Sequence, residues 1–272
     1  MVNHPSPLIG VLSDDVSQPS NAARLQEVHR QLGARGCAAL LIDSRAEASF
    51  RRLTPLLHGA IQLSGDFSPA FIAAAGQLPR VALDSLCQNG FRAGAEMARL
   101  LLAQGHQRFG YLAAWPNGDA ARLDGFSRTL AAAGSELSQQ LTAAQGPQRD
   151  SGYQAVMAYL KRARSAERLQ ALFCDSDLLA FGALQAVRDF GQGAHVAVVG
   201  FGDSAEAGAS TWHLTSWAPP HALQVTEALN RLLLNRADED GAWRHGTLRV
   251  RHSHFGKAVP GDMGECGCAN RH

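Results

Sequence analysis

The chain has 272 residues and is 46% apolar, enough to bury a large core as one domain or as two lobes of about 100 to 150 residues each. Lys and Arg number 25 against 24 Asp and Glu, a net charge of +1, so the composition offers no overall basic field to hold DNA phosphates. Its longest apolar runs fall far short of the roughly 18 residues of a membrane span, which argues against a transmembrane protein.

In the first part of the chain, short apolar runs alternate with amphipathic helix patterns. The runs typical of strands are 8–12, 38–42, 59–63 and 80–84, and the helix patterns are 22–34, 69–76 and 90–104. These elements predict an N-terminal lobe over residues 8–106, preceded by a disordered remnant at 1–7.

The alternation continues after the glycine at 105, which ends a helix. A C-terminal lobe over residues 107–220 is predicted, with strands at 109–113, 140–144, 169–174, 196–201 and 214–217 and helices at 120–133, 152–164 and 178–190. A helix at 221–235 and a strand at 247–254 are expected to return the chain to the N-terminal lobe, which then includes about 221–255. The glycine-rich residues 256–272 are expected to be a flexible tail.

This order predicts an α/β fold of two doubly wound parallel-sheet lobes. Open parallel sheets bind ligands at the carboxyl ends of their strands, so the loops that follow strands are where site residues are expected.

Five segments resemble, in order, the effector domains of lactose/galactose-repressor (LacI/GalR) transcription regulators. Residues 8–19, LIGVLSDDVSQP, are similar to the family's IGVLVPDLSNP, and residues 93–112 to its helix, GH(R)RI turn and strand. Residues 122–126, RLDGF, resemble its RxxGF motif. Residues 174–184 resemble (A/N)DxxAxGAL, and VVGFGD (198–203) with LTSW (214–217) resembles VVGFDD and LTTV.

The resemblance implies a type I periplasmic-binding-protein-like architecture with three crossovers, a small ligand in the cleft between the lobes, and a homodimer. The family's helix-turn-helix and hinge helix precede the first strand. Because seven residues precede Leu8 here, we expect the chain itself not to bind operator DNA.

Arg122 is the leading candidate ligand contact, because a guanidinium offers a fork of donors to hydroxyls or to a carboxylate. Its alternative role is a surface ion pair with Asp119 or Asp124. Ser176 and Asp177 stand at a predicted helix start, where capping and ligand contact are compatible. Asp175 is expected to be the less important residue of that segment.

Four further polar residues occupy loops that line the family's cleft. Asp203 follows Gly202, which replaces the first acidic residue that the family usually has in this turn. The Gly-Asp turn, together with the dipeptides Ala93-Gly94 and Met97-Ala98, resembles the gluconate-repressor branch of the family. Asp15 and Ser17 either contact ligand or form a turn. Asn89 falls where the family often has Asp, and its amide suits a polyol or caps a helix.

Trp115 and Trp217 follow predicted strands, and an indole ring commonly packs on the apolar face of a sugar. Packing inside the protein is the alternative for both. These aromatics complete the predicted ligand-binding set, in which no residue is assigned a catalytic role.

Neither a cofactor nor a metal is expected. The predicted tail offers at most three metal donors, from Cys266, Cys268 and His272. The sequence contains no nucleophile elbow, phosphate-binding loop, dinucleotide fingerprint or zinc-protease helix. The chain is therefore not expected to be an enzyme.

The favoured function is the effector-binding and dimerisation core of a LacI/GalR-type regulator that senses a sugar, sugar acid or related metabolite. Without a secretory signal pattern, a cytoplasmic location is expected, with no membrane partner. Two alternatives stay open: a periplasmic sugar-binding receptor for a transporter, and a headless cytoplasmic ligand-binding homologue.

Overall fold

The computed structural model describes residues 6–43, 45–65, 67–86, 90–116, 118–191 and 194–256. The chain divides into two compact units: unit 1 comprises Met1–Gln88 and Pro220–His245, and unit 2 comprises Asn89–Pro219 and Gly246–His272. It passes three times from one unit to the other, as the resemblance implies. The expected disordered remnant and flexible tail fall, apart from residues 6, 7 and 256, outside the described residues.

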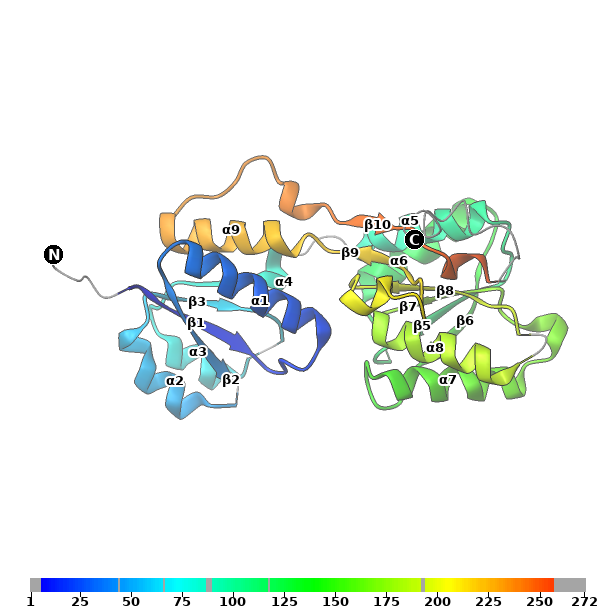
Figure 1. Cartoon of the computed structure of the whole chain (residues 1–272), viewed down its shortest axis with the longest axis horizontal. Helices are drawn as coiled ribbons and strands as arrows, with labels where there is room; N and C mark the ends of the chain where they lie inside the picture. Colours follow the sequence, from blue (N-terminus) through cyan, green and yellow to red (C-terminus); the bar gives the residue numbers. More distant parts are fainter. Residues whose placement is uncertain are drawn as a thin grey trace. The chain divides into compact units, whose positions relative to one another are not determined.

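Unit 1 is built on a four-stranded parallel sheet, within the described part of the chain, in the order β2-β1-β3-β4. Its elements are β1 (Leu8–Ser13), α1 (Pro19–Ala34), β2 (Ala38–Asp43), α2 (Glu47–Leu53), β3 (Gly59–Gln62), α3 (Pro69–Ala75), β4 (Arg80–Ala82), α4 (Leu83–Leu86) and α9 (His221–Leu234). Side chains alternate between the two faces of each strand. Ile9 and Val11 therefore join a core with α1 and α9, while Leu12 joins one with α2 and α3 (Figure 1).

Unit 2 is built on a sheet whose described strands follow the order β10-β9-β8-β7-β5-β6. Its elements are α5 (Gly90–Ala103), β5 (Phe109–Ala113), α6 (Ala120–Ala132), β6 (Leu137–Thr142), α7 (Arg149–Arg162), β7 (Ala171–Cys174), α8 (Asp177–Phe190), β8 (Ala197–Phe201), β9 (Thr215–Ala218) and β10 (Thr247–Arg249). Tyr111 packs in the core beneath α5 and α6, and its neighbour Leu112 packs beneath α7 and α8. Unit 2 thus has helices on both faces of its sheet, and the predicted α/β fold is confirmed.

Helices α5 and α6 pack unusually closely because glycines lie at their crossing. A Cβ atom on Gly94 would lie 2.0 Å from the carbonyl oxygen of Arg122, and one on Gly125 would lie 2.0 Å from that of Phe91. Both distances are far below van der Waals contact, so neither position accepts a side chain without moving a helix. This crossing fixes the start of α6 and with it the position of Arg122.

The structure draws several boundaries differently from the sequence analysis. Helix α5, expected in the N-terminal lobe, belongs to unit 2, because its apolar face, including Met97 and Leu101, packs on Phe109 and Phe126. The strand expected at 80–84 ends at Ala82, and α4 begins at Leu83. Strand β6 and helix α7 each begin three residues earlier than expected.

The last strand does not return to unit 1. Strand β10 covers Thr247–Arg249 and pairs antiparallel with β9 in unit 2, so the expected assignment of 247–254 was wrong. The strand is short because the chain then leaves the ladder: the Arg251 amide donates to the Thr215 hydroxyl, and the Ser253 hydroxyl donates to the Val198 carbonyl. A short helical turn at Ser253–Phe255 follows.

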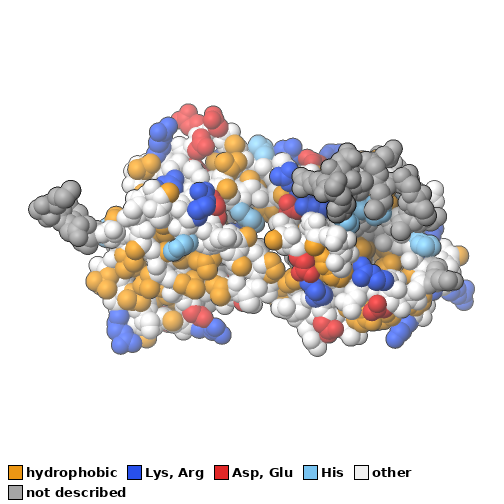
Figure 2. Space-filling model, in the orientation of Figure 1, with side chains coloured by type: hydrophobic (Ala, Val, Ile, Leu, Met, Phe, Trp, Pro, Cys, Tyr) orange, Lys and Arg blue, Asp and Glu red, His pale blue; other side chains and the backbone are white. Residues whose placement is uncertain are grey.

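The surface of unit 2 mixes charges of both signs, and Figure 2 shows basic and acidic side chains interspersed on the face it presents. Unit 1 exposes large apolar side chains, among them Leu41, Leu56 and Ile72. No helix in the described ranges is both long enough and apolar enough to cross a bilayer.

Candidate functional site

Polar side chains gather where the parallel strands of unit 2 end. We call them the carboxyl-edge cluster, consisting of Asp119, Arg122, Asp175, Asp177, Asp203, Ser216 and Arg251. Strands β5, β7, β8 and β9 are neighbours in the sheet, so the residues that follow β5, β7 and β8 meet Ser216 of β9 at one edge. Arg251, which follows β10, reaches the cluster through its side chain and lies 132 positions after Asp119.

Arg122 lies at the centre of this cluster and is 6% exposed. Its Nη1 donates to the carbonyl oxygen of Asp175 at 2.7 Å and to Oδ1 of the same residue at 3.0 Å, while Nη2 donates to Oδ2 of Asp119 at 3.0 Å. The guanidinium also stacks on the ring of Phe201, 3.5 Å from its centroid. Pairing with Asp119 was one of the predicted alternatives, but the side chain is buried rather than on the surface.

Asp119 has a second role as the N-cap of α6, where its Oδ1 accepts from the backbone N–H of Arg122 at 2.9 Å. Asp175, ranked low from the sequence, is the residue that ties the cluster together. Its carboxylate accepts from the hydroxyl of Tyr111 and from the backbone N–H of Ala114 in addition to Arg122. Burial raises the pKa of the Tyr111 hydroxyl, which therefore acts as a donor to Asp175.

Ser176 and Asp177 begin α8 as expected. The Ser176 hydroxyl accepts from the backbone N–H of Leu179 at 3.3 Å, which confirms its capping role. The Asp177 carboxylate is buried and accepts from the hydroxyl of Ser216 and the backbone N–H of Ser204, each at 2.6 Å. Burial raises the pKa of Asp177, and nearby Asp203 acts in the same direction.

Asp203 adopts a positive φ of 47° after Gly202, whose φ is 127°. This backbone turns the carboxylate toward the last segment of the unit, where Arg251 Nη2 donates to it at 2.6 Å and Arg249 Nε lies 3.8 Å away. Asp203, which follows the glycine that replaces the family's usual first acid, is thus held in an ion pair.

The two candidate tryptophans have different environments. Trp115 follows β5 and is 58% exposed, with its ring close to Gly146, so it remains available to a ligand. Trp217 is fully buried in the core beneath α5 and α6, which corresponds to the packing alternative.

The candidates of unit 1 form a turn at the end of β1. Asp15 Oδ1 accepts from the backbone N–H and the hydroxyl of Ser17 at 2.8 and 2.6 Å, and the hydroxyl bond is the main reason that the pKa of Asp15 is lowered. The turn-forming role is confirmed, and ligand contact by this pair stays a prediction. Asn89 lies outside the described residues.

Sequence reasoning missed a buried polar group in unit 1. Arg24 of α1 donates to the carbonyl oxygen of Leu63 and to Asp84 at 2.7 Å, and it lies close to His221 in the first turn of α9, where the side chain of Gln224 is fully buried. The sequence did contain a signal for this buried group, because Arg24 and Gln224 lie on the apolar faces of two predicted helices. Coming from segments about 60 and 200 residues apart, they meet only in the folded unit.

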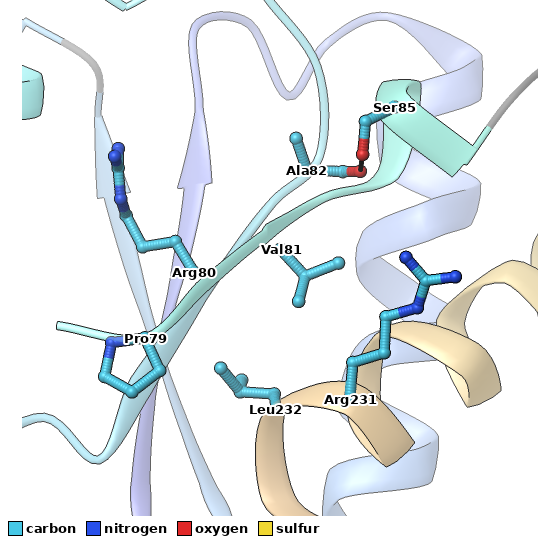
Figure 3. A pocket seen from close by; sticks show the side chains of 7 residues that line it. All are labelled: Pro79, Arg80, Val81, Ala82, Ser85, Arg231 and Leu232. Carbon is cyan, nitrogen blue, oxygen red and sulfur yellow. Dashed lines mark hydrogen bonds between the residues drawn. The ribbon is translucent and has the colours of Figure 1, made fainter. Parts of the chain in front are cut away.

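Unit 1 also holds a cavity of about 390 Å³ between β4 and α9. Figure 3 shows Val81 and Leu232 pointing toward each other across it, with the guanidinium groups of Arg80 and Arg231 extending to opposite sides. Two arginines in the lining would suggest an anionic ligand. Because their guanidinium groups do not converge, the cavity is poorly suited to bind one.

Comparison with known proteins agrees with this architecture. Residues 98–253, more than half of the chain, match the family described as periplasmic binding protein-like domain. The chain is 30% identical to the HTH-type transcriptional regulator GalS of Salmonella typhimurium over 80% of its own length and 59% of that regulator's. It is 24% identical to the HTH-type transcriptional repressor PurR of Pectobacterium carotovorum, covering 93% of the chain and 81% of the repressor.

Among solved structures, a LacI family transcriptional regulator from Lactobacillus casei with bound glucose superimposes with a TM-score of 0.72. The match covers 91% of the chain and 100% of that structure at 23% identity, a level that shows the shared fold alone. The chain belongs to the periplasmic binding protein-like domain family, and over most of its own length it is similar to HTH-type transcriptional regulators.

Proposed function

We propose that this chain is the metabolite-sensing core of a cytoplasmic transcription regulator and has no catalytic activity. In this proposal it binds a sugar, sugar acid or related small metabolite at the carboxyl-edge cluster of unit 2. Operator DNA would be held by a helix-turn-helix segment of the kind that the names of the relatives specify. Ligand binding changes DNA affinity to the extent that the two conformations of the regulator bind the ligand differently.

The observation that carries the proposal is the network around Arg122. A buried guanidinium held by Asp119 and Asp175, on the ligand-binding side of a parallel sheet, is an ordered array of donors and acceptors. Trp115 follows β5, and its exposed ring adds an apolar surface beside these polar groups. Such a combination of few fixed polar groups and an aromatic face is typical of small-molecule sites.

A homodimer is part of the proposal. Strand β2 is an edge strand in the described part of unit 1, and Leu41 on it is 47% exposed. An unpaired apolar edge in a well-packed unit is usually covered by a partner. Light scattering on the purified chain tests this: we expect a mass near twice 29.0 kDa, and a monomer at micromolar concentration would contradict the dimer.

Ligand binding is tested by thermal unfolding in the presence of sugars, sugar acids, polyols, purines and nucleosides, including the glucose found in the Lactobacillus casei regulator. A ligand that binds the folded chain raises the unfolding midpoint as its concentration exceeds Kd.

Two variants locate the site for each ligand that binds. Trp115→Ala removes an exposed ring and is expected to fold normally and bind at least tenfold more weakly, whereas Trp243→Phe, in unit 1 and away from the cluster, is expected to bind like the parent. A panel without a single binder, on well-folded protein, would refute metabolite sensing of these classes.

A further inference from the structure

The charge balance of the carboxyl-edge cluster restricts the class of ligand that it accepts. We propose that the cluster selects an uncharged, hydroxyl-bearing ligand and discriminates against its carboxylate and phosphate analogues. This inference rests on the proposed function, since it concerns the same site. It opposes the sugar acid that the gluconate-repressor-like turn at 202–203 would suggest.

The first step is the state of Arg122. A free guanidinium attracts carboxylates strongly and in a fixed bidentate geometry. Here both terminal nitrogens already contact carboxylates, those of Asp119 and Asp175, and one face of the group lies on Phe201. Its Nε is buried without a partner among the described residues. A ligand carboxylate would become a third negative charge around a single positive one.

The second step concerns the other charges of the cluster. Arg251 is paired with Asp203 at 2.6 Å, with Arg249 at 3.8 Å from the same carboxylate. Asp177 is buried, and it accepts two hydrogen bonds without an arginine partner among the described contacts. Counting the described members together with Arg249, four aspartates face three arginines. The cluster therefore holds no excess of positive charge with which to bind an anion.

The third step concerns the helix ends. The N-termini of α6 and α8 point their free N–H groups toward this edge, and such ends normally attract anions. Asp119 caps the first of them, and Ser176 caps the second, with the carboxylate of Asp177 in its first turn. Side chains of the protein thus already use the favourable ends of both helix dipoles.

What remains suits hydroxyl groups. The Asp119 side chain is 39% exposed and that of Asp203 is 19% exposed, so both carboxylates retain lone pairs that accept from a ligand O–H. A sugar or polyol meets these groups without adding charge, and its apolar face fits the ring of Trp115.

Isothermal titration at pH 7 with matched pairs tests the inference. The probes are D-glucose with D-gluconate, D-galactose with D-galactonate, and adenosine with adenosine monophosphate. We expect at least one neutral member to bind and its acidic partner to bind at least tenfold more weakly. An acidic member that binds as tightly as its neutral partner, or more tightly, overturns the inference and leaves the sensor proposal intact. If no probe binds, the proposed ligand class itself is refuted, and with it this inference.

A charge variant makes the test specific for Arg122. Asp119→Asn removes one of its two carboxylates while keeping an N-cap side chain, so the ratio of acidic to neutral affinity is expected to rise at least tenfold. Asp124→Asn is the matched control, because Asp124 lies on the same helix and pairs with the exposed Arg128. An unchanged ratio in Asp119→Asn would show that the charge around Arg122 does not set selectivity.

Discussion

Replacing Arg122 by Met should be one of the most destabilising single changes in unit 2. The substitution keeps an aliphatic stem of similar length but leaves the Asp175 carboxylate, whose side chain is 6% exposed, without its cationic partner. Breaking a buried ion pair in this way costs about 3–5 kcal/mol. The hydroxyl of Tyr111 and the backbone N–H of Ala114 still donate to Asp175, so we expect a loss near 3 kcal/mol, about the lower end of that range.

Arg128→Met provides the control on the same helix. Its ion pair with Asp124 is exposed, with 72% of the arginine side chain accessible, so its loss should cost about 0–1 kcal/mol. Urea unfolding followed by circular dichroism measures both free energies. In the double variant Arg122→Met/Asp175→Asn, removal of the stranded charge should recover about 1–3 kcal/mol. Losses for Arg122→Met and Arg128→Met that agree within experimental error would refute the reasoning, as would a double variant no more stable than the single one.

The remaining predictions concern the helix crossing and the buried histidines. Gly125→Ala forces a methyl group against the Phe91 carbonyl and should lower the free energy of unfolding by about 2–3 kcal/mol. Gly33→Ala, which has open space around it in α1, should raise that free energy by about 0.5–1 kcal/mol. Equal urea midpoints for the two variants would contradict the close packing of α5 on α6. Burial, with Arg24 nearby, lowers the pKa of His221 to about 4, so the unfolded chain takes up this proton first as the pH falls. Stability present above pH 6.5 should thus be lost between pH 6.5 and 4, by up to about 3 kcal/mol from this residue. His221→Gln should flatten that part of the stability profile; a profile unchanged by His221→Gln would contradict the assignment.

Local patterns predicted the elements of the fold well, because each strand and helix is encoded by a short stretch of sequence. The strand at Phe109–Ala113 was predicted with its observed ends, since it is apolar throughout and lies between Gly105 and the polar loop after Trp115. The strand expected at 247–254 failed for a physical reason. After Arg249 the chain bonds to the Thr215 hydroxyl and, through the amides of His252 and Ser253, to the carbonyl oxygen of His213 ahead of β9. Residue periodicity carries no information about these substitutes for ladder hydrogen bonds.

The site was predicted only in part, because strand order decides which loops meet. Arg122 was recognised from a motif, and its neighbour Asp119 lies three residues away on the same helix. Asp175 lies 53 residues further along the chain, and it reaches Arg122 because β7 pairs directly with β5 and skips β6. Ranking Asp175 below Asp177 was reasonable from helix-capping rules, yet capping depends on local sequence and the ion pair on topology.

The same distinction explains why the ligand class could not be predicted from the motif. An arginine at the start of a helix suggests an anion as readily as a sugar, and the sequence alone leaves its charge uncompensated. The fold supplies Asp119 on one side and Asp175 on the other, and it places Asp203 against Arg251 rather than against Arg122. Selectivity in this site therefore follows from which charges the sheet order brings together. Two relatives that share the RxxGF motif can be expected to prefer ligands of different charge if they differ at the residue that corresponds to Asp119.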